Sequence, residues 1–331
     1  MTGAGGSIGS ALALRLAEIA PRQLILLESS ESALFALESA LAGTAIQKPP
    51  NRALGSVQDA SLLDELFAQY RPSLVFHAAA FKHVLLLEGH PLAAIENNVF
   101  GTRTLASGAA ANGARVVLLS TDKAVEPASI MGATKRVAEH IVLGAGGIVL
   151  RLGNVLASSN SVAESFARQI VAGGPLTVTD PAARRYFLTV EEAVDLLIAA
   201  SREPERPNLL AADLRSPQYI TDLARFMAYT LAPDQEISID FTEPRSGDKE
   251  LEKLWSSDET AVVAATQGLV SIRPSWVAGA AFDRELGALL SATCGRDLPT
   301  ALAVLRSLVP DFTPSAVLLA LAQRSASRVA P

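Results

Sequence analysis

Short apolar runs alternate with longer stretches of helical periodicity through the first half of the chain. The apolar runs lie at residues 23–28, 52–55, 73–77, 115–119 and 147–151. Between them, apolar residues recur at the spacing of amphipathic helices. Strands that are apolar on both faces and separated by helices are typical of a parallel sheet covered on both sides. The pattern therefore predicts an α/β fold, a Rossmann-like doubly wound parallel sheet, in residues 1–155.

The regular alternation of apolar runs and helical stretches ends at about residue 155. Turns rich in Gly, Pro, Ser and Asn separate shorter elements there. Helical periodicity returns at about 190–202, 219–231, 298–309 and 314–325. Residues 156–331 are therefore predicted to form a smaller, mixed α/β part that ends in helices.

The chain opens on a glycine-rich turn, with Gly3, Gly6 and Gly9 leading into a helix. This spacing is typical of a loop whose backbone amides hold a dinucleotide pyrophosphate, although glycine turns also cap ordinary helices. Such a loop normally follows a buried strand, and here the first β-strand is apparently missing. In a doubly wound sheet of order 3-2-1-4-5 that strand is central, so its neighbours should lack a partner. We expect a start upstream of Met1, where this strand and a membrane-anchored region would lie.

Composition narrows the class of protein. Hydrophobic residues make up 49% of the 331 positions and charged residues 19%, which excludes disordered and fibrous classes. The net charge of -6 gives no general attraction for nucleic acid. No apolar run reaches the ~20 residues of a membrane helix, so no span is expected in this chain. The single cysteine, Cys294, cannot form an internal disulfide or a cysteine-rich metal site, which suits a cytoplasmic protein without a metal.

Two strand ends carry candidate cofactor contacts. Glu28 follows the glycine turn by about 20 residues, where a carboxylate can accept hydrogen bonds from a ribose hydroxyl and repel a 2′-phosphate. This position favours NAD over NADP, but a solvated acid at a strand end is an equally good interpretation. Ala78 and Ala79 are small enough to let a ligand approach the backbone. His77 has no readable nucleophile or acid partner, so we expect a packed histidine.

The most informative stretch is Thr121-Asp122-Lys123, which follows the apolar run at 115–119 and precedes Lys135. Ligands of open parallel sheets bind at the carboxyl ends of the strands. An adjacent acid and amine there can have pKa values pulled apart by burial and by each other, which suits proton delivery and removal. The alternative is a helix-capping turn with a solvent-facing lysine, and spacing alone favours neither.

Seven segments together resemble the CapD-like polysaccharide-biosynthesis branch of the extended short-chain dehydrogenase/reductase superfamily. They are TGAGGSIGS, FHAAAFKHV, ENNVFGT, STDKAVEPASIMGATKRVAE, RLGNVLASSNSV, RRYFLTVEEAV and LVPDFTP. The superfamily generally has Tyr-x-x-x-Lys where this chain has Met131 and Lys135, and methionine there resembles the large dehydratases of the branch. The resemblance implies a nucleotide-sugar 4,6-dehydratase that uses NAD or NADP. Its substrate would be UDP-N-acetylglucosamine or another UDP-N-acetylhexosamine, and its product a 4-keto-6-deoxy sugar for surface polysaccharide or glycan.

The resemblance also implies roles for individual residues. Lys123 would remove the C5 proton, Asp122 would assist departure of the C6 hydroxyl, and Thr121 would orient the sugar. Lys135 would hold the nicotinamide ribose, next to Met131. The other cofactor contacts would come from Gly3, Gly6, Ser7, Ile8, Gly9, Glu28, Ala78, Ala79 and Lys82. Substrate contacts would come from Lys82, Asn98, Asn154, Arg185 and Arg245, the last three at the UDP pyrophosphate.

Departures from the branch keep two other functions open. Ala157 and Asn160 stand where glycine is usual, which would shift uridine affinity or sugar preference. A 4-epimerase is one alternative, and Met131 disfavours it because epimerases of this superfamily use the tyrosine as the C4 base. A non-catalytic nucleotide-binding subunit or a truncated fragment is the other. Members of the branch commonly associate, so a homo-oligomer is expected.

Overall fold

The computed structural model describes residues 1–44, 48–156, 158, 161–204, 208–214, 216–243, 245–274 and 279–329. In the first half, strands and helices alternate as the apolar runs predict. The strands are β1 (Ile25–Glu28), β2 (Asn51–Leu54), β3 (Leu74–His77), β4 (Arg115–Thr121) and β5 (Ile148–Leu152). The helices are α1 (Ser7–Ile19), α2 (Glu31–Ala42), α3 (Ala60–Tyr70), α4 (Val84–Gly89), α5 (Pro91–Ala94), the π-helical segment η1 (Ile95–Gly101), α6 (Thr102–Ala111) and α7 (Ile130–Gly144).

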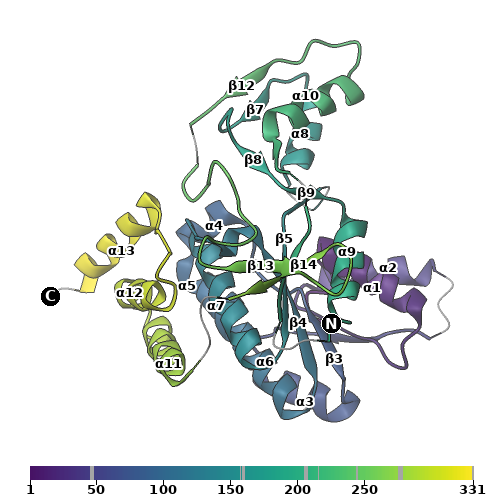
Figure 1. The fold of residues 1–331 in the computed structure, drawn as a ribbon, viewed down its shortest axis with the longest axis vertical. Helices are drawn as coiled ribbons and strands as arrows, with labels where there is room; N and C mark the ends of the chain where they lie inside the picture. Colours follow the sequence, from purple (N-terminus) through teal and green to yellow (C-terminus); the bar gives the residue numbers. More distant parts are fainter. Residues whose placement is uncertain are drawn as a thin grey trace.

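A six-stranded sheet in the order β13-β14-β10-β5-β4-β3 forms the centre of the molecule (Figure 1). Strand β10 (Asn208–Ala212) lies parallel to β5, whereas β14 (Leu269–Arg273) and β13 (Thr260–Val263) are antiparallel to their neighbours. Strands β1 and β2 form a separate parallel pair. The predicted α/β, Rossmann-like fold is confirmed. Three strands of the main sheet follow residue 155, so the boundary expected there does not coincide with the edge of this sheet.

A smaller unit projects from one end of the central sheet (Figure 1). It contains two pairs of short strands and two helices around a core that includes Phe166, Leu176 and Ala224. A third strand pair packs against the central sheet through Val155 and Leu188. The strand pairs are β6 (Asn154–Val155) with β9 (Phe187–Leu188), β7 (Leu176–Val178) with β12 (Ile239–Phe241), and β8 (Arg184–Arg185) with β11 (Gln218–Tyr219). The helices are α8 (Val162–Val171) and α10 (Ile220–Leu231).

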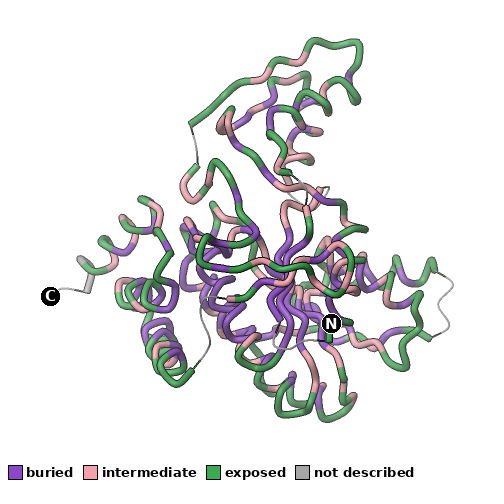
Figure 2. The backbone as a smooth tube through the Cα atoms, in the orientation of Figure 1, coloured by how far each residue is buried: buried purple, intermediate pink, exposed green. Residues whose placement is uncertain are grey.

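Helices cover both faces of the central sheet, and buried residues concentrate along its strands (Figure 2). Alternate residues of β4 point to opposite faces. Val117 joins a core with α1 and α9 (Val190–Ala200), whereas Val116 and Leu118 join a larger core with α3, α6 and α7. The parallel strands are therefore apolar on both faces because each face is buried.

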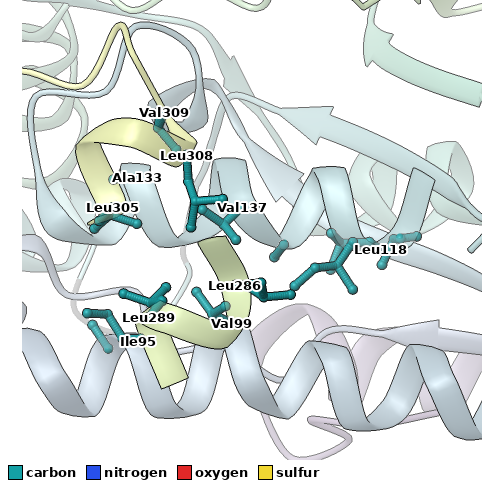
Figure 3. Packing of buried hydrophobic residues seen from close by; sticks show 14 of the residues in the cluster. Ile95, Val99, Leu118, Ala133, Val137, Leu286, Leu289, Leu305, Leu308 and Val309 are labelled. Atoms are coloured by element: carbon teal, nitrogen blue, oxygen red, sulfur yellow. The ribbon is translucent and has the colours of Figure 1, made fainter. Parts of the chain in front are cut away.

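Three C-terminal helices complete the larger core: α11 (Ala280–Cys294), α12 (Leu298–Leu308) and α13 (Ala316–Val329). Figure 3 shows Leu286, Leu289 and Leu305 from α11 and α12 packed beside Ile95, Val99 and Val137 from η1 and α7. Helix α7 is consequently buried along nearly its whole length. Among the described helices, none is both long enough and apolar enough to cross a membrane.

Met1 and Thr2 lie between β1 and β3 and join the two sheets. The Leu27 N–H donates to the Met1 carbonyl (2.9 Å), and the Thr2 N–H donates to the Phe76 carbonyl (3.0 Å). Next to Met1, an apolar cavity of about 350 Å³ separates the two strands, with Leu27, Leu63, Phe67, Phe76 and Leu105 in its wall. Thr2 forms isolated bridges with Leu27 of β1 and His77 of β3, and among the described residues no strand lies between β1 and β3. The missing first β-strand stays an expectation.

A buried ion network, formed by Arg136, Glu139, Arg151 and Glu259, ties three parts of the fold together. Arg151 on β5 is fully buried and donates to both oxygens of Glu139 on α7 (2.9 and 2.7 Å). It also donates to both oxygens of Glu259, which lies just before β13 (2.7 and 3.0 Å). Arg136 donates to the same two glutamates at 3.2 and 2.8 Å. These ion pairs therefore fix the stretch before β13 to β5 and α7.

An engineered chain with about four β-branched apolar residues ahead of Met1, matching the length of β1 and β3, should be more stable to heat. Filling the cavity would bury side chains worth roughly 1.5–3 kcal/mol each and would pair the open strand edges. We expect Tm to rise by several degrees in differential scanning calorimetry. A Gly-Ser extension of equal length is the control, and an equal Tm for both extensions would contradict the prediction.

Arg151→Met should destabilise the fold strongly, because among the described residues it leaves Arg136 as the remaining ion-pair partner of the buried carboxylates of Glu139 and Glu259. Breaking a buried ion pair on one side costs about 3–5 kcal/mol. Thermal denaturation should show a Tm lower by about 4–7 °C. Arg273→Met, at an exposed position of β14, is the matched control and should change Tm little. Equal Tm values for the two variants would contradict this.

Candidate active site

The glycine turn before α1 is too tightly packed for side chains. Gly3 has φ +65°, and a Cβ there would lie 2.6 Å from the Ala79 nitrogen. A Cβ at Gly9 would lie 1.9 Å from the Gly3 carbonyl oxygen. Gly6 caps α1 without a side-chain hydrogen bond, so backbone amides form this helix N-terminus. The turn fits the pyrophosphate of a dinucleotide, which the amides and the helix dipole would hold.

Glu28 fixes the glycine turn to the end of β1. Its Oε2 accepts a hydrogen bond from the Gly5 N–H (2.9 Å), and its Oε1 accepts from the N–H groups of Ser29 and Ser30 (2.9 and 3.0 Å). The side chain is largely buried. It is therefore not the solvated acid of the alternative interpretation. The ribose contact stays a prediction.

The turn after β4 brings Thr121, Asp122 and Lys123 into one hydrogen-bonded group. The Thr121 hydroxyl donates to Asp122 Oδ1 (2.8 Å), and Lys123 Nζ donates to the same oxygen (2.9 Å). Lys123 Nζ also donates to Asn154 Oδ1 on β6 (2.9 Å). Asp122 is fully buried, and its Oδ2 has no hydrogen-bond partner among the described residues. The capping-turn alternative required a lysine that faces solvent. Lys123 is instead held by this hydrogen-bonded group.

The charge of Lys123 follows from its neighbours. Burial lowers the pKa of Lys123, but the carboxylates of Asp122 and Glu252 outweigh it, so the pKa is raised above its usual value. Lys123 is consequently an ammonium group near neutral pH. The hydrogen bond to Asp122 gives it a direct path for its proton.

Helix α7 contributes Met131 and Lys135 to the same region. Ser129 caps the helix by accepting a hydrogen bond from the Gly132 N–H. Met131 and Lys135 are four residues apart and share one face. Lys135 Nζ donates to the Leu119 carbonyl (2.8 Å), and burial lowers the pKa of Lys135 to about 8. The two lysines of the site therefore have pKa values shifted in opposite directions.

A cavity of about 500 Å³ lies between the glycine turn, the end of β4 and α7. It brings together most of the residues singled out from the sequence. Those that line it are Gly3, Gly6, Ser7, Ile8, Gly9, Ala78, Lys82, Thr121, Lys123, Met131, Lys135 and Asn154. No tyrosine lies in its wall among the described residues.

Asn98 was expected at the substrate but does not line the cavity. It is buried on η1, where its amide nitrogen donates to the Phe81 carbonyl (3.0 Å) and to the Thr134 hydroxyl (3.1 Å). Its amide oxygen accepts from the Phe81 N–H (2.8 Å). Asn98 therefore fixes the backbone just before Lys82, which does line the cavity.

The two predicted pyrophosphate arginines occupy different environments. Arg185 is buried and donates to the carbonyls of Arg184 (2.8 Å) and Glu250 (3.1 Å). Arg245 is exposed, and neither arginine lines the cavity. Their contact with a pyrophosphate stays a prediction. Ala157 and Asn160 lie outside the described residues.

His77 bridges two elements, as a packed histidine. Its Nδ1 is 2.7 Å from the Thr2 hydroxyl, and its Nε2 is 2.9 Å from the Thr102 hydroxyl. Burial lowers the pKa of His77 to about 3, so the ring is neutral. The prediction of a packed histidine is confirmed.

Two residues of the site were not found from the sequence. Glu252 is almost completely buried, with Oε1 3.8 Å from Lys123 Nζ. Lys249 Nζ lies 2.7 Å from Glu252 Oε2 and donates to the Val125 carbonyl (2.8 Å). In the sequence, these two residues show only as an acid three residues after a lysine, in a stretch with no helical or strand periodicity.

The fold and sequence match known proteins. EpsC of Bacillus subtilis, a probable polysaccharide biosynthesis protein, is 38% identical over 268 residues, which is 78% of this chain and 45% of EpsC. The chain thus spans about half the length of this relative. A UDP-glucose 4-epimerase of Rickettsia rickettsii is 36% identical over 219 residues, covering 63% of this chain and 62% of that protein.

Solved structures share the fold. Pen from Bacillus thuringiensis superposes with a TM-score of 0.74 at 26% identity, covering 82% of this chain and 86% of Pen. DesIV of Streptomyces venezuelae, a dTDP-glucose 4,6-dehydratase solved with NAD and TYD, has a TM-score of 0.64 at 22% identity, over 86% and 89% of the two chains. The family model described as polysaccharide biosynthesis protein matches residues 1–274. With most of its length matched by that model, and with five of the seven segments that suggested the resemblance contributing residues to the wall of one cavity, the chain belongs to the polysaccharide biosynthesis protein family.

Proposed function

We propose that this chain catalyses the NAD(P)-dependent 4,6-dehydration of a UDP-N-acetylhexosamine, as a step toward a polysaccharide or glycan. The observation that carries this proposal is the Asp122–Lys123 pair. Lys123 faces the cavity that the glycine turn also lines, and Asp122 is bonded to it from the buried side. An acid and an amine in contact suit a reaction that removes one proton and delivers another.

The glycine turn and α7 would hold the cofactor. The amides before α1 fit its pyrophosphate, and Lys135 lies where it would hold the nicotinamide ribose. When bound, the nicotinamide would take hydride from sugar C4 and return it to C6. Dehydratase and epimerase relatives both use nucleotide sugars by their names, which supports this substrate class.

The resting pair carries its proton on Lys123, and one internal transfer makes it competent. Moving the proton from Lys123 Nζ to Asp122 Oδ1, across 2.9 Å, creates an amine base and a carboxylic acid together. The Lys123 amine then takes the C5 proton. Asp122 gives its proton to the C6 hydroxyl through the Thr121 hydroxyl, which is bonded to Asp122 and lines the cavity, and water leaves. The pair is then ammonium and carboxylate, and when hydride returns to C6 the Lys123 ammonium gives a proton to C5. The C4 hydroxyl proton leaves to solvent during oxidation, and one proton from solvent restores the Lys123 ammonium, so the protons balance over the cycle.

A 4-epimerase is the second candidate, favoured by the relative of that name in Rickettsia rickettsii. Epimerisation needs a group that takes the C4 hydroxyl proton and gives it back. The cavity wall shows no tyrosine among its described residues, and Met131 stands four residues before Lys135. Dehydration also oxidises C4, but it additionally removes a proton at C5 and delivers one at C6, so it accounts better for the Asp122–Lys123 pair.

Gly9→Ala should weaken cofactor binding, because its Cβ would lie 1.9 Å from the Gly3 carbonyl oxygen and distort the turn. Titration with NADH, followed by its fluorescence, should show at least a roughly tenfold weaker Kd, which corresponds to about 1.4 kcal/mol. Gly89→Ala is the control, because a Cβ there meets no atom within 4 Å. Equal affinity of both variants and the original chain would contradict a cofactor site at this turn.

Lys123→Met and Asp122→Asn should each lower the rate of dehydration by about a hundredfold or more, because each removes one half of the proton-transfer pair. The purified chain, UDP-N-acetylglucosamine and NAD should give a product lighter by one water, with a 4-keto group and deuterium at C5 in D₂O. Mass spectrometry and NMR measure this. NADH binding should stay intact in both variants.

Two outcomes would overturn the dehydratase. A product that keeps its 6-hydroxyl and has inverted C4 would establish the epimerase instead. Undiminished turnover in Lys123→Met would show that the pair is not the proton-transfer group.

A further inference from the structure

The segment 248–252 crosses from the smaller unit to the turn that holds Lys123. On one side, the Arg184 N–H of β8 donates to the Glu250 carbonyl (2.9 Å), and Arg184 forms a parallel bridge with Leu251. On the other side, Lys249 Nζ donates to the Val125 carbonyl, directly after the turn Asp122–Ala124. The segment is therefore attached to β8 on one side and to the turn that holds Lys123 on the other.

Glu252 ends this segment with its carboxylate between two ammonium groups. Its Oε2 lies 2.7 Å from Lys249 Nζ, and its Oε1 lies 3.8 Å from Lys123 Nζ. The first contact is a close ion pair, whereas the second is too long for a hydrogen bond and acts through charge alone. Glu252 is only 2% exposed, so water screens this interaction little.

We propose that Glu252 is a positioning residue for Lys123: its buried negative charge keeps Lys123 as an ammonium group in the resting site. The catalytic consequence rests on the proposed function. Each internal transfer to Asp122 leaves Lys123 neutral, and the charge of Glu252 favours the return of a proton. Asp122 cannot supply this bias alone, because it is the acceptor of that proton.

The groups around Lys123 support this assignment. Asp122 and Glu252 raise the pKa of Lys123 against burial, and Arg185 opposes them. The pKa of Glu252 is itself lowered by Lys123 and Lys249 despite burial, so Glu252 remains an anion. The facing groups are Asp122 on the turn, Arg185 on β8, and Asp248, Lys249 and Glu252 on the crossing segment.

Glu252→Gln should lower the pKa of Lys123 by about one unit or more, because it removes one of two negative charges near the amine. NMR titration of the full chain, with lysine labelled with carbon-13 at Cε and Lys123 assigned from the Lys123→Met spectrum, measures this directly. Glu243→Gln makes the same charge change at an exposed position outside the site and should leave the pKa of Lys123 unchanged.

Lys249→Met separates charge from packing. It removes a positive charge next to Glu252, so the pKa of Lys123 should rise, in the direction opposite to Glu252→Gln. A merely structural role would loosen the site in both variants and move the pKa in the same direction. This variant also keeps the inference testable if Glu252→Gln does not fold.

The pH profile of dehydration connects the inference to turnover. In Glu252→Gln, the pH at which the rate of C5 deuterium incorporation reaches half its maximum should fall with the pKa of Lys123. An unchanged pKa in that variant, or shifts of the same sign in both variants, would overturn the inference. If the pKa values move as stated but the original chain makes no 4-keto product, the proposed function fails while the role of Glu252 stands.

Discussion

The buried ion network beneath β4 and β5 is the constraint on which the site depends. Burial raises the pKa of Glu139 to about 7, even though Arg136 and the Ser120 hydroxyl oppose the rise. Its carboxylate is therefore only marginally charged and needs its cationic partners. Network residues directly adjoin site residues: Ser120, bonded to Glu139, precedes Thr121, and Arg136 follows Lys135. A shift in the network would move both lysines of the site.

The opposite wall of the cavity is fixed by a different buried contact. The neutral ring of His77 joins Thr2, at the start of the glycine turn, to Thr102 on α6. Both walls at the reacting end are thus held by satisfied buried polar groups. The cavity wall is more open at Lys82, which is exposed. This division suits a site that fixes its chemistry tightly and binds the rest of the substrate with adaptable side chains.

Local pattern was enough to predict the strands of the first half of the fold, because β1, β3, β4 and β5 are continuous apolar runs. Strands β10, β13 and β14 of the central sheet were not predicted. Helix α3 begins at a side-chain cap, since Asp59 accepts a hydrogen bond from the Leu62 N–H. The runs equally placed Thr121, Asp122 and Lys123 at a strand end. Helices α4, α8 and α11 were not predicted, since glycine, serine and proline turns around them hide their periodicity.

The contacts that complete the site could not be predicted in this way. Glu259 lies more than a hundred residues from Arg136 and Arg151 in the sequence, and Glu252 is equally distant from Lys123. Both follow a stretch without periodicity, so no spacing indicates which strand they meet. Asn98 shows that a motif can also suggest a contact that the structure does not contain. Its position in a motif suggested a substrate contact, whereas its amide binds the backbone of Phe81 and the Thr134 hydroxyl.

The two lysines of the site differ because of the number of carboxylates each one faces. Lys123 has Asp122 and Glu252, and their charges outweigh burial. Lys135 has Glu139, but Arg151 and Arg136 already bind both oxygens of that carboxylate, so burial dominates and lowers the pKa of Lys135. Environments that push two titratable groups apart divide acid and base roles between them. The ion network thus has a second effect besides stabilising the fold. Because its arginines pair with Glu139, Lys123 is the lysine of the site with the higher pKa.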